Sequence, residues 1–476
     1  MNFKVELPKL IDVDYVLEDY GHVSNNPKEN GVLIQSLIDK CSLNGGGRIV
    51  LPAKYISSSP IILKDNVNLY LPLNCYLFFP KKKEFYQVKM ANWEGMECMR
   101  CNSPISAYKV SNIAITGRGT IDGDGFSWRP LKQFKVPQKF FDKCLQKSPY
   151  VIEGKESLIW FPSKSSYEGC LLTEAKMDLN LAQEYYDFFR PVLISIVECD
   201  HILIEGIISS NSPAWNIHPL FCSHLTMNNV IVKNEYSAQN GDGVDVESCT
   251  NVEIKNSTFE VGDDGICIKA GKNKKARLIK RPTKNVYIHD CMVYHAHGGI
   301  VIGSEMSRGI ENLWCTNSTF VGTDIGIRFK SAIGRGGVVA DIHIENINMV
   351  DILNEAMIFN MDYSLFKMEH ETTDDVVTTD PSDIPYFRDI YINNVYCSSS
   401  KTALKVVGIN DKTIDKIYIK DSYINSLNTY TLKKCGKVHC ENVTFNINGK
   451  EEFIENKDHR TYKSCLLYTS DAADEL

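Results

Sequence analysis

A short alternating pattern recurs along most of the chain. From about residue 60 an apolar–polar–apolar triplet is followed closely by Asn, Asp or Gly, and most copies lie 23 to 34 residues apart; the clearest span residues 202–206, 225–229, 252–256, 286–290, 342–346, 390–394 and 417–421. Alternation is typical of strands, and repetition at this period without helical patterning indicates a solenoid of strands. Asn and Asp suit the tight turns between strands because both tolerate left-handed backbone.

The period chooses between two repeat folds. A β-propeller needs about 40 residues and four strands for each blade, which is longer than the spacing in this chain. A parallel β-helix fits, so we predict an all-β solenoid. The 476 residues would otherwise suggest two or three domains, but each repeat of a solenoid packs only on its neighbours. We expect one β-helix catalytic domain over residues 1–464.

One short helix is predicted near the start of the chain. Helical spacing is shown by Leu33, Ile34, Leu37, Ile38 and Cys41. Asn30 is the expected N-cap, and the glycine-rich residues 44–47 end the helix before a strand at residues 48–51. Such a helix would cap the apolar end of the solenoid, where no further repeat covers it.

Three segments break the repeat. Residues 127–190 combine aromatic and helical character, and residues 362–388 are rich in Asp and Thr. Insertions in a solenoid become loops on one face, often the binding face, so we expect at least the first insertion to wall the active cleft. Residues 465–476 continue no pattern and resemble a translated sequencing adapter, so we expect a non-native tail and exclude it from the interpretation.

Four motifs with charged residues fall within residues 240–330. They are Asn240-Gly241-Asp242-Gly243, Gly262-Asp263-Asp264-Gly265, Ala296-His297-Gly298-Gly299 and Gly326-Ile327-Arg328-Phe329-Lys330. The steps from Asp242 through Asp264 and His297 to Arg328 are 22, 33 and 31 residues, close to one coil each. Residues one coil apart stack at about 4.8 Å, so we predict a column on one outer face. Arg328 and Lys330 are two residues apart and point the same way, while the residue between them points inward.

Three crowded carboxylates suit glycoside hydrolysis. Mutual repulsion raises at least one pKa, which leaves a protonated acid beside ionised bases. One carboxylic acid can then protonate the leaving oxygen while another carboxylate activates water or attacks directly. His297 can tune the protonation of its neighbours. Arg328 can bind an anionic sugar carboxylate as a bidentate fork, and Lys330 as a point charge.

A run of cations supports an anionic substrate. Residues 269–284 hold eight Lys or Arg and no acid, in a chain whose net charge is −7. We expect a positive lobe at the mouth of the site, beginning at Lys269; the alternative is an ordinary solvated loop. The overall negative charge gives no reason to expect nucleic acid or an anionic membrane as a partner.

The ordered set of motifs resembles glycoside hydrolase family 28, the polygalacturonases and their relatives, over most of the chain. The Asn-Thr-Asp motif of that family is similar to residues 240–242, with Gly241 in place of Thr, and its Asp-Asp motif matches residues 263–264. Its Gly-His-Gly is similar to residues 296–298, with Ala296 in the first place, and its Arg-Ile-Lys to residues 328–330, with Phe in the middle. These departures affect only spacer residues.

The resemblance implies a right-handed, single-stranded parallel β-helix like that of the pectin lyases. It also implies an inverting hydrolysis of α-1,4-linked galacturonic acid in pectic oligosaccharides or polysaccharides, with no metal and no other cofactor. Asp263 would be the general acid, and Asp242 and Asp264 would together activate water. His297 would maintain the protonation and orientation of the acid. The two cations of the last motif would bind the galacturonate carboxylate.

Further likeness points to the bacterial exo-acting branch of the family. It covers residues 93–95, 212–219, 297–305 and 334–337. Together with Lys269 from the cation run, the residues that we expect to bind substrate are Trp215, His218 and Glu305. For Trp215, interior packing is the alternative. The 127–190 insertion would close one end of the cleft and so favour release from a chain end.

The start of the chain and its cysteines bear on location. Residues 1–8 carry charges early and have no long apolar stretch, so no signal peptide is expected, and no run is long enough to span a bilayer. The sixteen cysteines are scattered and are expected to be reduced thiols; Cys98 and Cys101 lack the second pair that a structural zinc site needs. We expect a cytoplasmic enzyme that meets short imported oligosaccharides, with secretion as the alternative.

Other hypotheses stay open from the sequence. A rhamnogalacturonan or xylogalacturonan hydrolase would belong to the same family. A calcium-dependent pectate lyase also uses clustered aspartates on a β-helix, and Gly-Asp-Asp-Gly alone could be a pair of Ca²⁺ ligands. A non-catalytic β-helix that binds sugar is the third alternative. Three measurements distinguish these hypotheses: the dependence of activity on metal, the chemical form of the product, and the effect of replacing Asp263.

Overall fold

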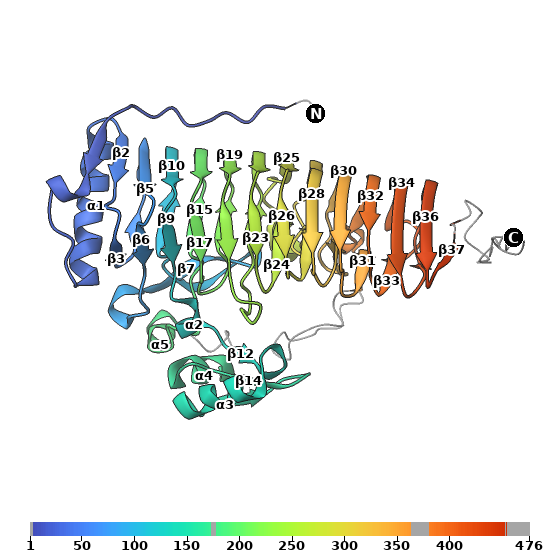
Figure 1. Cartoon of the computed structure of the whole chain (residues 1–476), viewed down its shortest axis with the longest axis horizontal. Helices are drawn as coiled ribbons and strands as arrows, with labels where there is room; N and C mark the ends of the chain where they lie inside the picture. Colours follow the sequence, from blue (N-terminus) through green and yellow to red (C-terminus); the bar gives the residue numbers. More distant parts are fainter. Residues whose placement is uncertain (1–2, 173–177, 363–379, 453, 455–476) are drawn as a thin grey trace, which may run out of the picture.

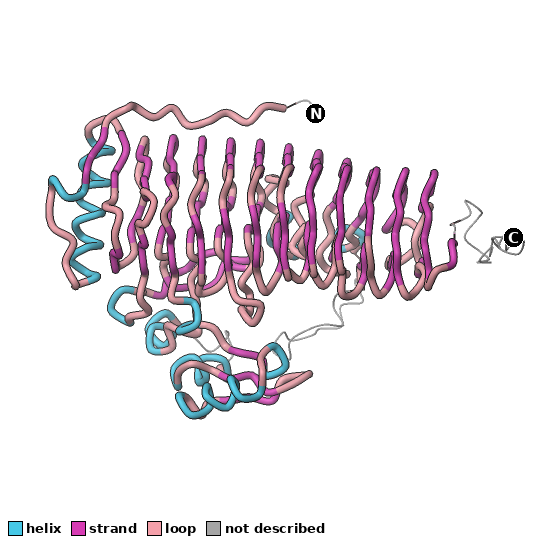
Figure 2. Tube along the Cα trace, viewed as in Figure 1, coloured by secondary structure: helices cyan, strands magenta, loops and turns pink. Residues whose placement is uncertain are grey.

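The alternating triplets form parallel strands that stack coil upon coil (Figures 1 and 2). This computed structural model describes residues 3–172, 178–362, 380–452 and 454. One inward row, paired in register from each coil to the next, consists of Val252, Val286, Leu313, Ile342, Ile390, Ile417 and Val438. Every member of this row is at most 2% exposed, so the core runs the length of the solenoid. The fold is the parallel β-helix that the repeat predicted, and it agrees with the architecture that the family resemblance implied.

One wall of the solenoid carries all four charged motifs. Within the described residues it is a parallel sheet of eleven strands: β4 (Ile61–Ile62), β9 (Ile105–Tyr108), β15 (Ile194–Val197), β18 (Ile217–Leu220), β21 (Val244–Glu247), β24 (Asp264–Lys269), β27 (Gly298–Ile302), β29 (Ile327–Lys330), β31 (Glu355–Asn360), β33 (Thr402–Val407) and β35 (Thr431–Lys433). The first three motifs end at or just inside the starts of β21, β24 and β27, and the fourth contains β29.

The other walls form one continuous sheet. Its first row contains β1 (Asp14–Val16), β2 (Gly47–Val50), β5 (Val67–Leu71), β10 (Ser111–Gly117), β16 (Asp200–Glu205), β19 (Ser223–Asn228), β22 (Thr250–Lys255) and β25 (Thr283–His289). Its second row contains β3 (Tyr55–Ser57), β6 (Tyr76–Phe78), β11 (Thr120–Asp122), β17 (Ile208–Ser210), β20 (Ile231–Lys233), β23 (Thr258–Glu260) and β26 (Met292–Tyr294). From there on, long strands span both rows: β28 (Ile310–Val321), β30 (Val338–Val350), β32 (Tyr386–Cys397), β34 (Ile414–Ser426) and β36 (Val438–Ile447). A last strand, β37 (Lys450–Glu452), pairs antiparallel with β36.

The Asn and Asp residues at the ends of the triplets occupy left-handed bends, which lie between strands on the earlier coils and within the long strands β30, β32 and β34 on the later ones. Asn229, Asn256, Asp290, Asn346, Asn394 and Asp421 all have φ between 48° and 55°, the left-handed region that these residue types tolerate. Their amides also bond from coil to coil: Asn346 donates to Asn317 at 3.0 Å and Asn394 donates to Asn346 at 2.8 Å. The turns therefore form ladders that keep successive coils in register.

The predicted helix caps the first coils, but it begins earlier than expected. Helix α1 (Pro27–Leu43) has Asn26 as its N-cap, whose side chain accepts from the N–H of Lys28. Proline at the first position suits a helix start, so the prediction of Asn30 as the cap is wrong. Asn30 is buried and instead ties the entering chain to the solenoid, because its amide bonds to both backbone groups of Ser24 and to the carbonyl of Ser57.

The predicted 127–190 insertion leaves the solenoid after β11 and returns before β15, and it lies beside the solenoid in Figure 1. It contains α2 (Gly125–Trp128), β12 (Leu131–Lys132), the 3₁₀ turn η3 (Gln133–Lys135), α3 (Gln138–Lys147), β13 (Val151–Glu153), β14 (Leu158–Trp160), α4 (Lys164–Leu171) and α5 (Leu179–Glu184). It has a small core of its own, built from Leu131, Phe141, Cys144 and Trp160.

Other predictions fall partly outside the described residues. Most of the 362–388 insertion and the whole 465–476 tail lie outside them; a 3₁₀ turn, η6 (Pro381–Asp383), leads into β32. The remaining 3₁₀ turns are η1 (Leu17–Asp19) and η2 (Lys83–Phe85). The fifteen cysteines within the described residues are free thiols. Among those residues, no helix combines the length and apolar character needed to cross a membrane.

Candidate active site

The strand register brings the acidic motifs and the histidine into one row, which we call the catalytic row (Asp242, Asp263, Asp264 and His297). Val244 pairs with Ile266 on the next coil, so Asp242 aligns with Asp264. Asp264 pairs in turn with Gly298, so the preceding residues Asp263 and His297 align. The spacing of the motifs therefore does correspond to one coil for these four residues.

Arg328 does not occupy the matching place on its coil. It pairs with Val301, and Val301 pairs with Cys267, which is three residues beyond Asp264. The prediction that Arg328 stacks directly on the row is wrong, because the coil from Val301 to its partner Arg328 spans 27 residues, whereas the step from His297 to Arg328 is 31 residues. The long side chain reaches back instead: its guanidinium lies 3.3 Å from Asp264 Oδ1 and 3.4 Å from the carbonyl oxygen of His297.

Lys330 reaches the same carboxylate. Its ammonium donates to Asp264 Oδ2 at 2.6 Å, and the two side chains are 10% and 4% exposed. Phe329, between the two cations, is fully buried against Phe359 with ring centroids 4.7 Å apart. Arg328 and Lys330 thus share one face of β29, as the alternation of a strand requires.

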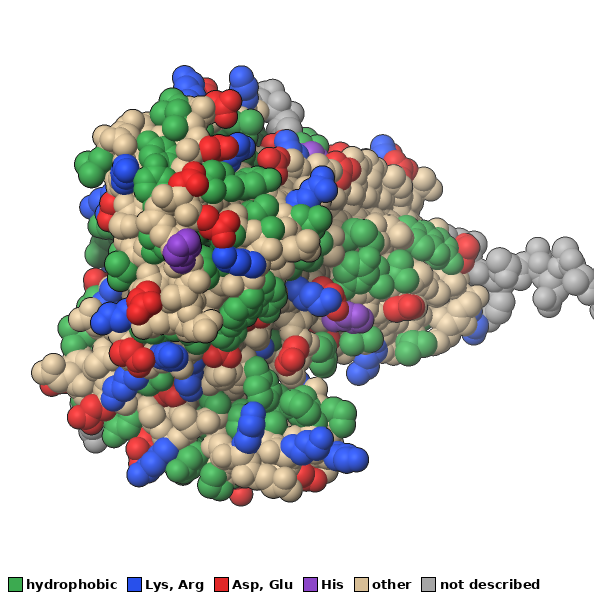
Figure 3. Space-filling model, turned by 60° about the vertical axis from the view of Figure 1, so that its left-hand side comes forward, with side chains coloured by type: hydrophobic (Ala, Val, Ile, Leu, Met, Phe, Trp, Pro, Cys, Tyr) green, Lys and Arg blue, Asp and Glu red, His purple; other side chains and the backbone are tan. Residues whose placement is uncertain are grey.

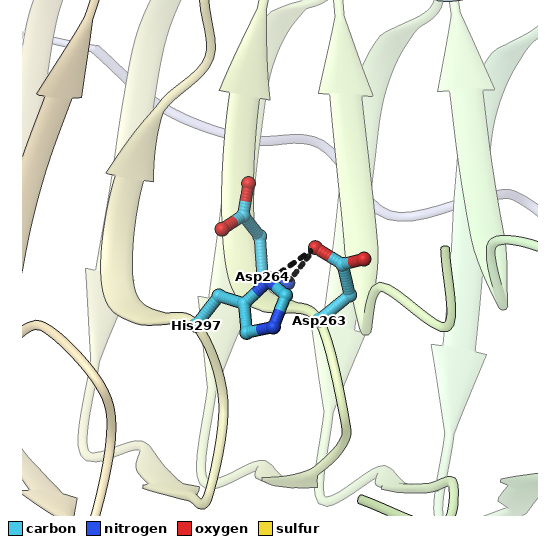
Figure 4. A group of neighbouring side chains, drawn as sticks. All are labelled: Asp263, Asp264 and His297. Carbon is cyan, nitrogen blue, oxygen red and sulfur yellow. Dashed lines mark hydrogen bonds and ion pairs between the residues drawn. The ribbon is translucent and has the colours of Figure 1, made fainter. Parts of the chain in front are cut away.

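Asp263 is held by three N–H donors. Its Oδ1 accepts from the backbone N–H of Asp264 and from Nδ1 of His297, both at 3.0 Å (Figure 4). Its Oδ2 accepts from the backbone N–H of Asn240 at 3.1 Å. The side chain of Asp263 is 20% exposed, whereas those of Asp264 and Asp242 are 4% and 5% exposed. Of the three aspartates, Asp263 is therefore the one that a substrate can reach directly.

Asp242 lies behind Asp263, beside a buried lysine. The ammonium of Lys269 is 3.9 Å from Asp242 Oδ2 and 2.9 Å from Asp245 Oδ1, and no side chain of the three exceeds 5% exposure. The ammonium of Lys269 thus interacts with two carboxylates. Asp245, which carries one of them, was not predicted as a site residue. Burial would raise the pKa of the half-buried Glu305, but the charge of Lys269 outweighs burial and lowers that pKa to about 2. Lys269, predicted to bind substrate, is buried and pairs with Asp245, whereas the substrate-binding role of the partly exposed Glu305 stays a prediction.

Among the aspartates of the catalytic row, Asp242 is the one whose pKa is raised. Burial raises the pKa of Asp242 well above its ordinary value, and the negative charges of Asp245 and Asp263 add to the effect. A carboxyl in this position gives up its proton less readily than an exposed one, because ionising it would bury a further negative charge. The expectation that crowding leaves one protonated carboxyl thus agrees with the electrostatics of the row.

The other two aspartates are ionised. Burial would raise the pKa of Asp263, but the hydrogen bond from His297 and the positive charges of Lys135 and Lys330 outweigh it and hold the pKa below its ordinary value. Burial is likewise outweighed at Asp264, whose pKa is lowered by Lys330 and Arg328. The pKa shifts therefore favour a proton on Asp242 over one on Asp263, the residue that the family resemblance assigns as the acid.

Trp215 and His218 lie behind the catalytic row, where each is 2% exposed. The indole of Trp215 stacks on Trp93 with centroids 4.1 Å apart, and the ammonium of Lys269 lies 3.7 Å from its ring centroid. His218 Nε2 is 3.0 Å from a carboxylate oxygen of Glu247. The prediction that Trp215 and His218 line the sugar site is wrong, because both are covered; their packing positions Lys269.

Half of the cations of the predicted positive lobe are neutralised by acidic partners. Four of the eight cations have acidic partners: Lys269 with Asp245, Lys272 with Glu94, Arg277 with Asp383 and Lys284 with Glu311. The others, around α6 (Asn273–Arg277), are exposed. Figure 3 shows positive and negative side chains interspersed over the face of the molecule in view. The positive charge that a substrate meets at the row comes from Arg328 and Lys330.

Lys135 belongs to the site and was not identified from the sequence. It ends η3 in the insertion, and its ammonium lies 3.0 Å from Nε2 of His297. It also donates to the carbonyl oxygens of Gly262 at 2.9 Å and Tyr236 at 3.4 Å. No local signal separates this lysine from the other lysines of residues 127–190. The contact shows that the insertion does reach the site, as predicted.

The outer face of the eleven-stranded sheet is covered on one side of the row. The outward positions in register on the earlier coils are His218, Asp245, Cys267 and Val301, none more than 2% exposed. A hairpin of β7 (Val88–Trp93) and β8 (Met96–Cys101) covers this area, with Trp93 on Trp215 and Glu94 paired to Lys272. On later coils the exposure at this position varies: the side chain of Arg328 is 19% exposed, Ile358 is 7% exposed, and the side chain of Lys405 is 39% exposed.

Three side chains of the row also have the spacing of metal ligands. Asp263, Asp264 and His297 offer one ligand atom each, all within 4.8 Å of one another. Asp264 already faces Lys330, and Nε2 of His297 already faces Lys135. Protein cations beside the same atoms oppose a further cation, so the set fits a metal-free site better than a metal site.

Comparison with known proteins agrees with this geometry. The family model for glycosyl hydrolases family 28 matches residues 183–456, more than half of the chain and all four motifs. The chain is 26% identical over 426 residues to an exo-poly-alpha-D-galacturonosidase of Dickeya chrysanthemi, covering 86% of this chain and 66% of that protein. It is 34% identical over 359 residues to a polygalacturonase of Ralstonia nicotianae, covering 72% and 64%. The chain thus spans about two thirds of the length of these relatives.

Solved structures show the same architecture. A hyperthermoactive exopolygalacturonase from Thermotoga maritima superposes with a TM-score of 0.75 at 25% identity, over 94% of each chain. A family 28 exopolygalacturonase of Yersinia enterocolitica superposes with a TM-score of 0.63 at 22% identity, over 91% of this chain and 78% of that one. The protein is a member of glycosyl hydrolase family 28.

Proposed function

We propose that the protein hydrolyses α-1,4-linked galacturonic acid at the ends of pectic chains, with inversion and without a metal. The observation that carries the proposal is the approach of Arg328 and Lys330 to Asp264, beside the partly exposed Asp263. Two cations next to an acid–base pair suit a sugar that carries a carboxylate close to its glycosidic bond. The galacturonosidase and polygalacturonase relatives support the same substrate class.

Asp263 is the proposed general acid although the pKa shifts in the free site favour a proton on Asp242. Exposure decides between them, because a donor must touch the leaving oxygen and the side chain of Asp242 is only 5% exposed. The charge of Lys330 contributes to lowering the pKa of both Asp263 and Asp264. A substrate carboxylate bound at Lys330 offsets that charge, so the pKa of Asp263 rises towards the value that an acid needs. Asp264, together with Asp242, then activates the water.

The covered face supports action at chain ends. The β7–β8 hairpin packs against Trp215 on the coil before Asp242, and Lys135 brings the insertion against His297. A polysaccharide that passed straight across the row would meet this cover. A chain end can enter, with the remaining sugars extending over the later coils, where outward positions such as Lys405 are accessible.

Product analysis on trigalacturonate and tetragalacturonate tests the proposal. We expect galacturonate and the oligomer one unit shorter at early times, no rise in ultraviolet absorbance from unsaturated product, and full activity in EDTA. Internal cleavage from the outset would contradict the exo assignment. An unsaturated product with calcium dependence would establish a lyase instead. Asp263→Asn should remove hydrolysis while the protein still folds, and undiminished hydrolysis in that variant would refute the role of Asp263.

A further inference from the structure

One lysine of the insertion joins the turns of three successive coils. The ammonium of Lys135 donates to Tyr236 O in the loop before Asp242 and to Gly262 O directly before Asp263, and it lies 3.0 Å from Nε2 of His297. A lysine ammonium has three N–H donors, and these three acceptors use all of them. A sugar could bind Lys135 only by displacing one of these partners. The contacts of Lys135 therefore serve to position groups within the protein.

The contact selects one protonation state of the histidine. An ammonium donates and cannot accept, so the Nε2 that faces Lys135 carries no proton and the ring proton lies on Nδ1. Nδ1 is 3.0 Å from Asp263 Oδ1 and donates to it. We propose that Lys135 is a positioning residue that holds His297 as the Nδ1–H tautomer and so keeps Asp263 oriented for the reaction; the effect on turnover rests on the function proposed above.

A competing group makes the choice of tautomer depend on Lys135. The carboxylate of Asp324 lies 3.7 Å from Nε2 of His297, on a side chain that is 23% exposed. A carboxylate near an imidazole nitrogen favours a proton on that nitrogen. Without Lys135, Asp324 is therefore left to draw a proton onto Nε2. The ring would then become either the Nε2–H tautomer or the doubly protonated form, and its donation to Asp263 would no longer be fixed.

The core of the insertion positions Lys135. Strand β12, directly before η3, pairs with β14 through Leu131 and Trp160, and both side chains are buried together with Phe141. Residues 132–135 thus connect the packed core of the insertion, which contains Leu131, to the ammonium of Lys135 at the catalytic row. The insertion accordingly does more than limit the access of substrate, because it also sets the hydrogen bonding of the catalytic histidine.

Nitrogen-15 NMR of labelled histidine tests the tautomer without any substrate. The His297 signals are assigned by their loss in His297→Gln, and the wild-type ring should show the Nδ1–H pattern. In Lys135→Met, which keeps an apolar side chain of similar length, the pattern should change to Nε2–H or to the doubly protonated ring. Lys139→Met, on the exposed surface of α3, is the matched control and should leave the His297 signals unchanged.

Steady-state kinetics test the consequence. Lys135→Met should lower kcat by about 10- to 100-fold, no more than the roughly 10²- to 10⁴-fold that a positioned acid or base contributes directly, with little change in KM because the donors of Lys135 face the protein. Lys135→Arg should recover part of kcat, and Lys139→Met should match the wild type. An unchanged His297 pattern in folded Lys135→Met, or a wild-type ring protonated on Nε2, would overturn the inference. If galacturonates are not hydrolysed at all but the tautomer changes as expected, the inference stands and the proposed function fails.

Discussion

Replacing Lys330 by Met should destabilise the protein by an amount that depends on pH. Its ammonium lies 2.6 Å from Asp264 Oδ2, and the two side chains are 10% and 4% exposed. Removing one partner of a buried ion pair costs about 3–5 kcal/mol. Since Arg328 still lies 3.3 Å from the other oxygen, we expect about 3 kcal/mol, at the lower end of that range. With an unfolding entropy of roughly 2 cal/mol/K per residue, a chain of 476 residues should lose about 3 °C of melting temperature at pH 7.

The sign of the pH dependence follows from Asp264. Burial would raise its pKa, but Lys330 and Arg328 outweigh burial and hold the pKa below its ordinary value. A carboxyl of this kind stabilises the fold above its unfolded pKa of about 3.9 and loses that contribution as the pH falls through the folded pKa. In Lys330→Met the buried carboxyl takes up a proton at a higher pH than in the wild type. The difference in melting temperature between wild type and variant should therefore shrink between pH 7 and pH 4.5.

Thermal unfolding followed by far-ultraviolet circular dichroism at both pH values provides the measurement. Lys420→Met is the matched control, because Lys420 lies 2.8 Å from Glu441 in a pair whose side chains are 50% and 72% exposed. An exposed pair of this kind contributes little, so the control should melt with the wild type at both pH values. If Lys330→Met melted with the control, or lost the same number of degrees at both pH values, the account of Asp264 as a buried carboxylate held by Lys330 would be refuted.

Three other expectations concern the core, the cap and metal. Phe329→Ala should cost about 3–5 kcal/mol because the ring is fully buried, whereas Phe134→Ala, 52% exposed in the wild type, should leave the melting temperature nearly unchanged. Asn26→Ala should cost about 1 kcal/mol as a lost N-cap, and Asn30→Ala should cost more, since it loses three hydrogen bonds; urea midpoints that ranked them in reverse would contradict this. Dialysis against EDTA should leave hydrolysis of trigalacturonate unchanged. If activity were lost and returned only with added Ca²⁺, the row would need a metal in addition to its protein cations.

Local patterns were sufficient for the fold because the β-helix is built from local repetition. Alternation places apolar residues such as Ile342 and Ile390 in the core whatever the rest of the chain does, and Asn or Asp at the next position suits the turn. The N-cap was predicted at the wrong residue because the local pattern alone does not choose between two suitable asparagines. Asn26 and Asn30 are both chemically competent caps, and the choice depends on Pro27 and on where the entering chain crosses β3.

The candidate site was predictable where it depends on coil spacing and not where it depends on contacts across coils. The four residues of the catalytic row follow from spacing and resemblance. The positions of Trp215 and His218 behind the row follow from a hairpin more than one hundred residues earlier, so no pattern around them reveals their burial. Lys135 is separated from His297 by 162 residues and becomes a partner only when the insertion packs against the solenoid.

The two cations near Asp264 connect substrate recognition to the chemistry of the row. In the free protein Lys330 and Arg328 lower the pKa of Asp264, and Lys330 also contributes at Asp263. A sugar carboxylate that binds these cations must share them with Asp264, because Lys330 and Arg328 lie 2.6 Å and 3.3 Å from its oxygen atoms. The shared charge makes Asp264 a stronger base and Asp263 easier to protonate, which are the two changes that hydrolysis requires. A sugar without a carboxylate would cause neither change, so selection for galacturonate follows from the electrostatics of the row as well as from its binding contacts.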